Sequence, residues 1–195
     1  NPTRRALNFT TRSLIGGGII LNGRVYMGSH SAAGEVSNLV TELGSMEGDD
    51  FRFDVIGKVA ESPVWAGKAS ASGLIAAYAA EKQLPAHAPQ PTGEEIFAAY
   101  AAGEPEACRA LKKFARRVAL GIIGLQSVLD VERVAIGGGI SAADALLPAI
   151  QTELDDLFAR CPVFPMLEPE LVRCRYGNDA NMIGALKLFF ERTPA

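Results

Sequence analysis

The residues with the clearest potential for chemistry are two runs of three glycines, Gly16-Gly17-Gly18 and Gly137-Gly138-Gly139. Glycine lets a backbone turn sharply and approach a ligand closely, because it has no side chain. Residues 134–136 predict a buried strand before the second run, and apolar residues at helical spacing follow it. A strand, a glycine turn and a helix start favour an anion or nucleotide site, since N–H groups and the helix dipole point at the ligand. A tight turn that binds nothing is the alternative.

The first glycine run lies in a predicted β-hairpin. Residues 6–10 read as one strand, and residues 15–21 and 24–27 read as two more, joined by Asn22-Gly23. An Asn-Gly pair between two strand-like runs is the strongest short hairpin signal. Glycines inside a strand indicate close approach of another backbone or of a ligand, and a bulge is the alternative.

Helices are predicted for residues 65–81, 94–102 and 105–129, the second of them starting at Thr92 or Gly93. In the longest helix, Gly121 and Gly124 weaken the helix locally, which indicates close packing against a neighbour. The basic residues of this helix are interpreted as a solvated face; they are Lys112, Lys113, Arg116 and Arg117.

Further along, Ser141 or Asp144 is expected to cap the helix after the second glycine run, and Asn178 or Asp179 to cap the last helix. A short strand is predicted at residues 171–174. Strands alternate with helices over the second half, so the predicted class is α/β.

Composition bounds the class of protein. The 195 residues suffice for one domain or one large lobe, and 48% hydrophobic against 21% charged residues allow a sizeable core. The net charge of −3 gives no reason to expect nucleic acid or an anionic membrane as a partner. Neither a transmembrane run nor a secretory signal core is present, so we expect a cytoplasmic protein.

Metal and nucleophile chemistry find little support in the residue types. The three cysteines are far apart and lack zinc-ligand spacing; they are Cys108, Cys161 and Cys174. An acidic run is interpreted as a solvated loop, because it does not match a calcium-binding loop; it comprises Glu47, Asp49, Asp50 and Asp54.

Several of these stretches together resemble the carboxyl-terminal lobe of the ROK proteins, a group of bacterial sugar kinases and sugar-responsive repressors. The matching segments, in the family's order and spacing, are residues 15–23, 32–35, 93–97 with the break at 103–104, 134–141, and 177–180 with 183–185. The resemblance implies the actin-like, ribonuclease-H-like ATPase fold, in which two lobes close on ATP and sugar. Residues 1–195 would then form a single carboxyl-terminal lobe, without the amino-terminal lobe that carries the catalytic aspartate.

The resemblance also implies roles for individual residues. Gly137, Gly138 and Gly139 match the loop along the adenosine and phosphates of ATP, and Gly16, Gly17 and Gly18 lie in the hairpin near the phosphates. Glu35 matches the glutamate that hydrogen-bonds sugar hydroxyls, and such charge-assisted bonds are strong. The cofactors expected are ATP and Mg²⁺.

Three departures from the family pattern limit these implications. Ser37 and Asn38 stand where glycine and histidine are usual; Asn38 can hydrogen-bond a sugar but is a poorer metal ligand. The cysteine-rich zinc loop is absent, so no structural zinc is expected, and residues 65–70 resemble the branch of β-glucoside kinases that lacks it. Residues 12–14 read Arg-Ser-Leu instead of the Gly-Thr-Gly phosphate loop.

Three functions remain open from the sequence. The first is the ATP- and sugar-binding lobe of a kinase that phosphorylates the 6-hydroxyl of a hexose or glucoside. The second is the sugar-binding lobe of a transcriptional regulator without catalysis. The third is an oligomerisation domain with degenerate sites. In each case we expect self-association, as a dimer, because a lobe cut from a two-lobe fold exposes an apolar surface.

Overall fold

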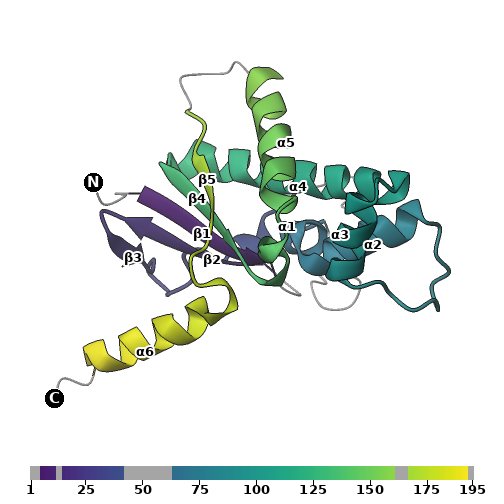
Figure 1. Ribbon diagram of the computed structural model, residues 1–195. Helices are drawn as coiled ribbons and strands as arrows, with labels where there is room; N and C mark the ends of the chain where they lie inside the picture. Colours follow the sequence, from purple (N-terminus) through teal and green to yellow (C-terminus); the bar gives the residue numbers. More distant parts are fainter. Residues whose placement is uncertain (1–4, 12–14, 42–62, 161–166, 193–195) are drawn as a thin grey trace, which may run out of the picture.

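A five-stranded mixed sheet forms the centre of the computed structural model, which describes residues 5–11, 15–41, 63–160 and 167–192 (Figure 1). The strands lie in the order β3-β2-β1-β4-β5. The first three are antiparallel, whereas β4 and β5 run parallel to β1. Their bounds are β1 Arg5–Thr11, β2 Ile15–Leu21, β3 Arg24–Tyr26, β4 Arg133–Gly137 and β5 Glu170–Arg173.

The amino-terminal hairpin predicted from the sequence is confirmed. Asn22 and Gly23 connect β2 to β3 with φ angles of 53° and 76°, the positive values that a tight hairpin turn requires. One face of the central strands is buried, and the strand register shows which residues share it, because paired residues of neighbouring strands point to the same side. On that face lie Leu7, Ile19, Val134 and Ile136, all buried.

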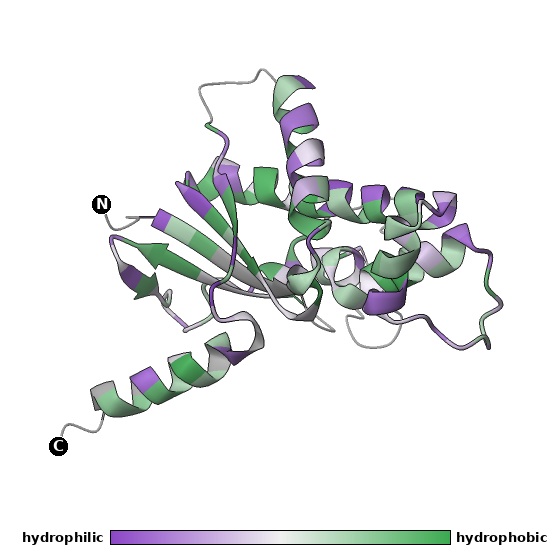
Figure 2. Cartoon of the chain, viewed as in Figure 1, coloured by the Kyte–Doolittle hydropathy of each residue, from purple (hydrophilic) through white to green (hydrophobic). Residues whose placement is uncertain are grey.

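The helices are α1 Trp65–Ala69, α2 Ala71–Glu81, α3 Gly93–Ala101, α4 Pro105–Leu129, α5 Leu146–Arg160 and α6 Ala180–Arg192. Three short 3₁₀ turns, η1 Val36–Asn38, η2 Gly139–Ala142 and η3 Gly177–Asp179, lie between them. The central strands are mainly apolar, whereas α5 and the outer turns of α4 carry many hydrophilic residues (Figure 2).

The single helix predicted for residues 65–81 is wrong. Ser70 adopts an extended conformation between α1 and α2, and its hydroxyl oxygen accepts a hydrogen bond from the Gly73 amide at 3.3 Å. Ser70 is therefore an N-cap in the middle of a continuous apolar pattern. The α3 start is confirmed, with a reciprocal capping box between Thr92 and Glu95.

The long helix α4 is the spine of the helical layer and packs against α1, α2, α3 and α5. The packing predicted at its glycines holds for Gly121, because a Cβ there would lie 2.1 Å from Cε2 of Trp65. The Trp65 indole N–H donates to the Arg117 carbonyl at 2.9 Å, and the side chain is fully buried. At Gly124 no atom of the described part of the chain lies within 4 Å of a Cβ, so the prediction is wrong at that position.

Helix α6 extends away from the rest of the fold (Figure 1). Its described apolar side chains are largely solvent-exposed; they are Met182, Ile183, Leu186, Phe189 and Phe190. In the described ranges, none of the helices combines the length and the hydropathy needed to span a membrane.

A carboxylate contact between α5 and the segment before β5 predicts a pH effect on stability. Gln151 donates from its amide to Asp155, at 2.6 Å, and to Glu168. Burial, followed by the neighbouring Asp155 carboxylate, raises the pKa of Glu168 above its ordinary value. A raised pKa means that the folded state holds the proton more tightly than the unfolded state, so this carboxyl group stabilises the fold at low pH and loses that contribution as pH rises through the folded pKa.

Glu168→Gln is therefore expected to raise the free energy of unfolding at neutral pH, and this gain should shrink as the pH falls toward the ordinary glutamate pKa. Urea unfolding of both proteins across this pH range measures the difference. A gain that is independent of pH would contradict the assignment to Glu168.

Candidate functional site

The sheet brings the two glycine runs together. Thr10 of β1 pairs with Gly16 on one side and with Gly137 on the other. The two runs therefore lie two strand spacings apart, about 10 Å. They are far apart in the sequence, and the topology places both beside the same end of β1.

The backbone of the second run adopts a conformation that only glycine tolerates. Gly138 has φ 92° and ψ 174°, and it is buried. Its carbonyl accepts hydrogen bonds from the Ser141 amide at 3.1 Å and from the Ser141 hydroxyl at 2.7 Å. Ser141 is itself buried, so the loop is held in one shape from inside the fold.

The prediction that Ser141 caps the following helix is wrong, because its hydroxyl donates to the Gly138 carbonyl. The Asp144 carboxylate is instead paired with Arg173 at 3.1 Å. The helix after the glycines also begins later than expected: the short turn η2 comes first, and α5 starts at Leu146. The amides nearest the glycine loop therefore belong to a 3₁₀ turn.

Two other segments border this loop that sequence reasoning did not assign to it. A Cβ on Gly93, the first residue of α3, would lie 3.3 Å from the Ile140 side chain of η2. The turn η3 also contacts η2. Neither contact has a sequence signal of its own, because both join segments distant along the chain.

Another backbone segment approaches the first glycine run closely, as expected if these glycines mark a close approach and not a bulge. Gly34 has φ 95°, and a Cβ there would lie 2.8 Å from the Gly17 carbonyl oxygen and 3.1 Å from the Gly18 Cα. The segment between β3 and η1 is therefore in direct backbone contact with β2. This close contact places Glu35, the next residue, beside the glycine strand.

Glu35 directly precedes η1 and Asn38 is its last residue, and both are exposed. Between them, Val36 and Ser37 are buried and fix the turn to the core. The Leu39 carbonyl accepts a hydrogen bond from the Trp65 amide at 2.6 Å, which ties the end of η1 to α1. The two polar side chains are therefore presented on an anchored turn.

The described residues fit a nucleotide at the glycine runs. Among the residues that the structure describes, none has an atom within 4 Å of a Cβ at Gly18 or at Gly139, so these residues leave open space beside both runs. Backbone N–H groups bordering open space suit phosphate oxygens. Residues 12–14 and the acidic run from Glu47 to Asp54 lie outside the described residues.

No group of three or more histidine, cysteine, aspartate or glutamate side chains in the described ranges is arranged to hold a metal ion. Cys174 follows β5, and its amide donates to the Ile136 carbonyl at 2.8 Å. Burial raises the pKa of the Cys174 thiol, which makes this cysteine a poor nucleophile.

The sheet order and both glycine runs agree with the resemblance to ROK proteins. The sequence pattern of the ROK family matches residues 9–192, which settles the family. The chain belongs to the ROK family. Its fold is accordingly the actin-like ATPase fold of ROK sugar kinases, with the mixed five-stranded sheet described above.

Relatives with known names include sugar kinases. It is 32% identical over 180 residues to the bifunctional enzyme NanE/NanK of Brucella melitensis, covering 92% of this chain and 29% of that protein. It is 27% identical to an N-acetylmannosamine kinase of Haemophilus influenzae, covering 90% of this chain and 52% of the kinase. The chain thus spans about half or less of the length of these relatives.

Solved ROK structures share the fold. A ROK glucokinase from Streptomyces griseus, in complex with glucose and AMPPNP, superposes with a TM-score of 0.74 at 22% identity, covering 96% of this chain and 61% of that one. A ROK transcriptional regulator, a homologue of the E. coli MLC protein, gives 0.66 at 22% identity, covering 93% and 44%. The fold is therefore common to kinases and to a regulator.

Proposed function

We propose that this chain is the ATP- and sugar-binding carboxyl-terminal lobe of a ROK sugar kinase that phosphorylates a hexose or glucoside. The observation that carries the proposal is the position of the two glycine runs on either side of β1. Glu35 lies beside the first of these runs. The names of the relatives, which include an N-acetylmannosamine kinase, support this class of substrate.

In this proposal Gly137, Gly138 and Gly139 hold the adenosine and phosphates, and Gly16, Gly17 and Gly18 lie near the phosphates. Glu35 accepts hydrogen bonds from sugar hydroxyls, and Asn38 donates to or accepts from another hydroxyl. When bound, ATP with Mg²⁺ supplies the phosphoryl group. The chain acts in the cytoplasm without structural zinc, and an amino-terminal lobe outside residues 1–195 supplies the catalytic aspartate.

The open space beside Gly139 supports the nucleotide role, because phosphates need backbone N–H groups without a side chain between. The buried Ser141, hydrogen-bonded to Gly138, supports it too, since a loop fixed before binding loses little entropy when the ligand arrives. The anchored turn η1 supports the sugar role for the same reason.

The second candidate is the sugar-binding lobe of a ROK regulator without catalysis. The likeness to the fold of a ROK transcriptional regulator favours it. The two candidates differ in whether they bind a nucleotide: a kinase lobe binds nucleotide and sugar, whereas a regulator lobe binds sugar alone. Failure to bind either ligand would leave the third interpretation, an oligomerisation domain with degenerate sites.

Calorimetric titration with AMPPNP and Mg²⁺, with and without glucose, N-acetylmannosamine and a β-glucoside, tests the proposal. The expected result is nucleotide binding that one sugar strengthens. Sugar binding without nucleotide binding would favour the regulator, and binding of neither would overturn both. Light scattering on the same samples tests the dimer, and a stable monomer at high concentration would contradict it.

Glu35→Gln is expected to weaken binding of that sugar by roughly 10- to 100-fold and to leave nucleotide affinity unchanged. The substitution keeps the shape of the side chain but removes the charge from its hydrogen bonds, which are each worth about 1.5–3 kcal/mol. Glu106→Gln at the start of α4 is the matched control, because it removes a glutamate that is paired with Arg109 outside the site. Equal sugar affinity in all three proteins would remove Glu35 from the site.

A further inference from the structure

A groove of about 1050 Å³ runs along the outward face of α4, between the end of α2 and α5. Its floor is formed by α4 and its walls by the two other helices. None of its lining residues belongs to the glycine runs or to η1. They are Glu81, Arg109, Lys112, Lys113, Arg116, Arg117, Leu120, Thr152, Glu153, Asp156 and Arg160.

Five of the six basic residues in this groove form one stripe on α4. Arg109, Lys112, Lys113, Arg116 and Arg117 follow each other at spacings that bring like charges together three or four residues apart. Such neighbours destabilise a helix. Interactions between side chains within α4 therefore do not account for the stripe. A solvated helix face does not require so many residues of one charge either.

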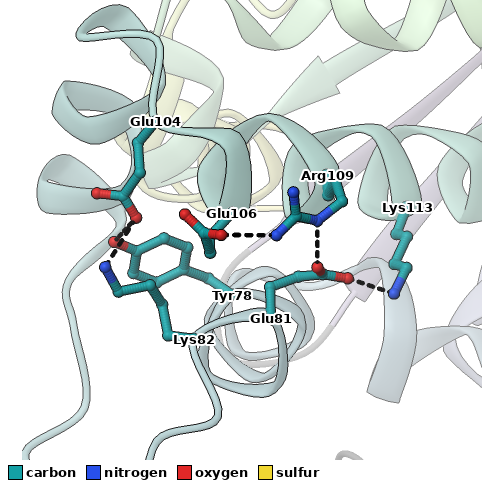
Figure 3. Close-up of polar contacts among 7 residues, drawn as sticks. All are labelled: Tyr78, Glu81, Lys82, Glu104, Glu106, Arg109 and Lys113. Atoms are coloured by element: carbon teal, nitrogen blue, oxygen red, sulfur yellow. Dashed lines mark hydrogen bonds and ion pairs between the residues drawn. The ribbon is translucent and has the colours of Figure 1, made fainter.

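Four carboxylates, Glu81, Glu106, Glu153 and Asp156, neutralise only part of the stripe. Glu81 pairs with Arg109, at 2.6 Å, and with Lys113 (Figure 3). These contacts join α2 to α4 and hold the two basic side chains in place. The hydrogen bonds from Lys113 and Arg109 lower the pKa of Glu81 below its ordinary value.

On the other wall, Arg116 pairs with Glu153 at 2.9 Å and with Asp156 at 2.5 Å, and Arg160 pairs with Asp156 at 2.6 Å. Lys112 also lines the groove, and it makes no ion pair with the described part of the chain. With Glu106 counted, six basic side chains face four carboxylates in and beside the groove, so the described residues leave a surplus of two positive charges there.

We propose that this groove binds an acidic segment of a partner polypeptide that also carries an apolar residue. Carboxylates of the segment would meet Lys112 and the remaining N–H groups of Arg116, whose Nη1 donates to both Glu153 and Asp156. The apolar residue would cover Leu120, which is 46% exposed at the groove floor. Walls on both sides suit an extended or helical segment.

Charge distribution favours a short acidic peptide over a nucleic acid. The whole chain has a net charge of −3, so with two surplus positive charges in and beside the groove the rest of the chain carries −5. A phosphate backbone long enough to gain from counterion release would run onto this negative surface. A peptide confined to the groove would not.

The test uses fluorescence anisotropy of the full chain with a labelled Glu-Glu-Leu-Glu-Glu peptide, a Gln-Gln-Leu-Gln-Gln peptide and a single-stranded oligonucleotide. The acidic peptide is expected to bind, more weakly as salt is added, and the glutamine peptide is not. Lys112→Glu should weaken acidic-peptide binding by roughly fivefold to tenfold, because it replaces an attraction by a repulsion. Lys112 is exposed, so the variant should fold.

Arg24→Glu on the edge strand β3 is the control, since it makes the same reversal of charge on an exposed residue outside the groove. It is expected to leave peptide binding unchanged. The proposal would be overturned if both variants weakened binding equally, if the oligonucleotide bound more tightly than the acidic peptide, or if no peptide bound.

Discussion

Replacing Gly138 by valine is expected to weaken nucleotide binding by at least about tenfold. The residue has φ 92° and ψ 174°, a region of backbone conformation open in practice only to glycine. A β-branched residue must leave this region, and the loop then loses the bonds that join Gly138 to Ser141. Because the proposed phosphate contacts are backbone N–H groups of the same loop, a shift of the backbone removes several of them together.

Calorimetry with AMPPNP and Mg²⁺ measures the effect, and circular dichroism measures how much of the fold survives. Gly103→Val is the matched control, because Gly103 also has a positive φ, 78°, with open space around it, in the turn between α3 and α4. Both variants should lose some stability, and only Gly138→Val should lose nucleotide affinity. Unchanged nucleotide affinity in Gly138→Val would show that this loop is not the site.

The largest effect on stability is expected from Gly121→Ala, which should lower the free energy of unfolding by about 2–4 kcal/mol. An added Cβ would lie 2.1 Å from Cε2 and 2.4 Å from Nε1 of Trp65. The fully buried indole must move, and its hydrogen bond to the Arg117 carbonyl is then lost. Since α1 is held to α4 through this contact, the turn η1 attached to α1 should loosen as well.

Gly124→Ala one turn later provides the control with the opposite sign. It has no atom within 4 Å of the new Cβ, so it should raise the free energy of unfolding by up to about 1 kcal/mol through helix propensity alone. Thermal and urea unfolding of the two variants measure both changes. Equal effects at the two positions would mean that Trp65 does not pack against Gly121.

The sequence by itself predicted the elements whose signals are local. The Asn22-Gly23 turn requires positive φ at both residues, and this requirement is read directly from the residue types. Pro105 and the three- and four-residue spacing of apolar positions predicted α4 with its observed bounds. The resemblance to ROK proteins rested on short segments of this kind, and the family match over residues 9–192 confirms it.

Where a local signal had two uses, the sequence alone could not choose between them. Ser70 interrupts an apolar helical pattern that otherwise continues, and its role as an N-cap depends on the packing of α1 against α2. Ser141 could cap a helix or fix the loop before it, and the buried geometry of Gly138 selects the second. The glycines of α4 look alike in sequence, yet Trp65 lies against only one of them.

Only part of the candidate site could be predicted from the sequence. Residue types identified both glycine runs, because the conformational freedom of glycine is visible in a single residue. Glu35 and Asn38 were added only by the resemblance to ROK proteins. The proximity of the two glycine runs came from the strand order, which sets Gly16 and Gly137 on either side of Thr10. Gly34 against β2, and Gly93 against Ile140, were decided by tertiary packing alone, because contacts between segments distant along the chain leave no pattern in either segment.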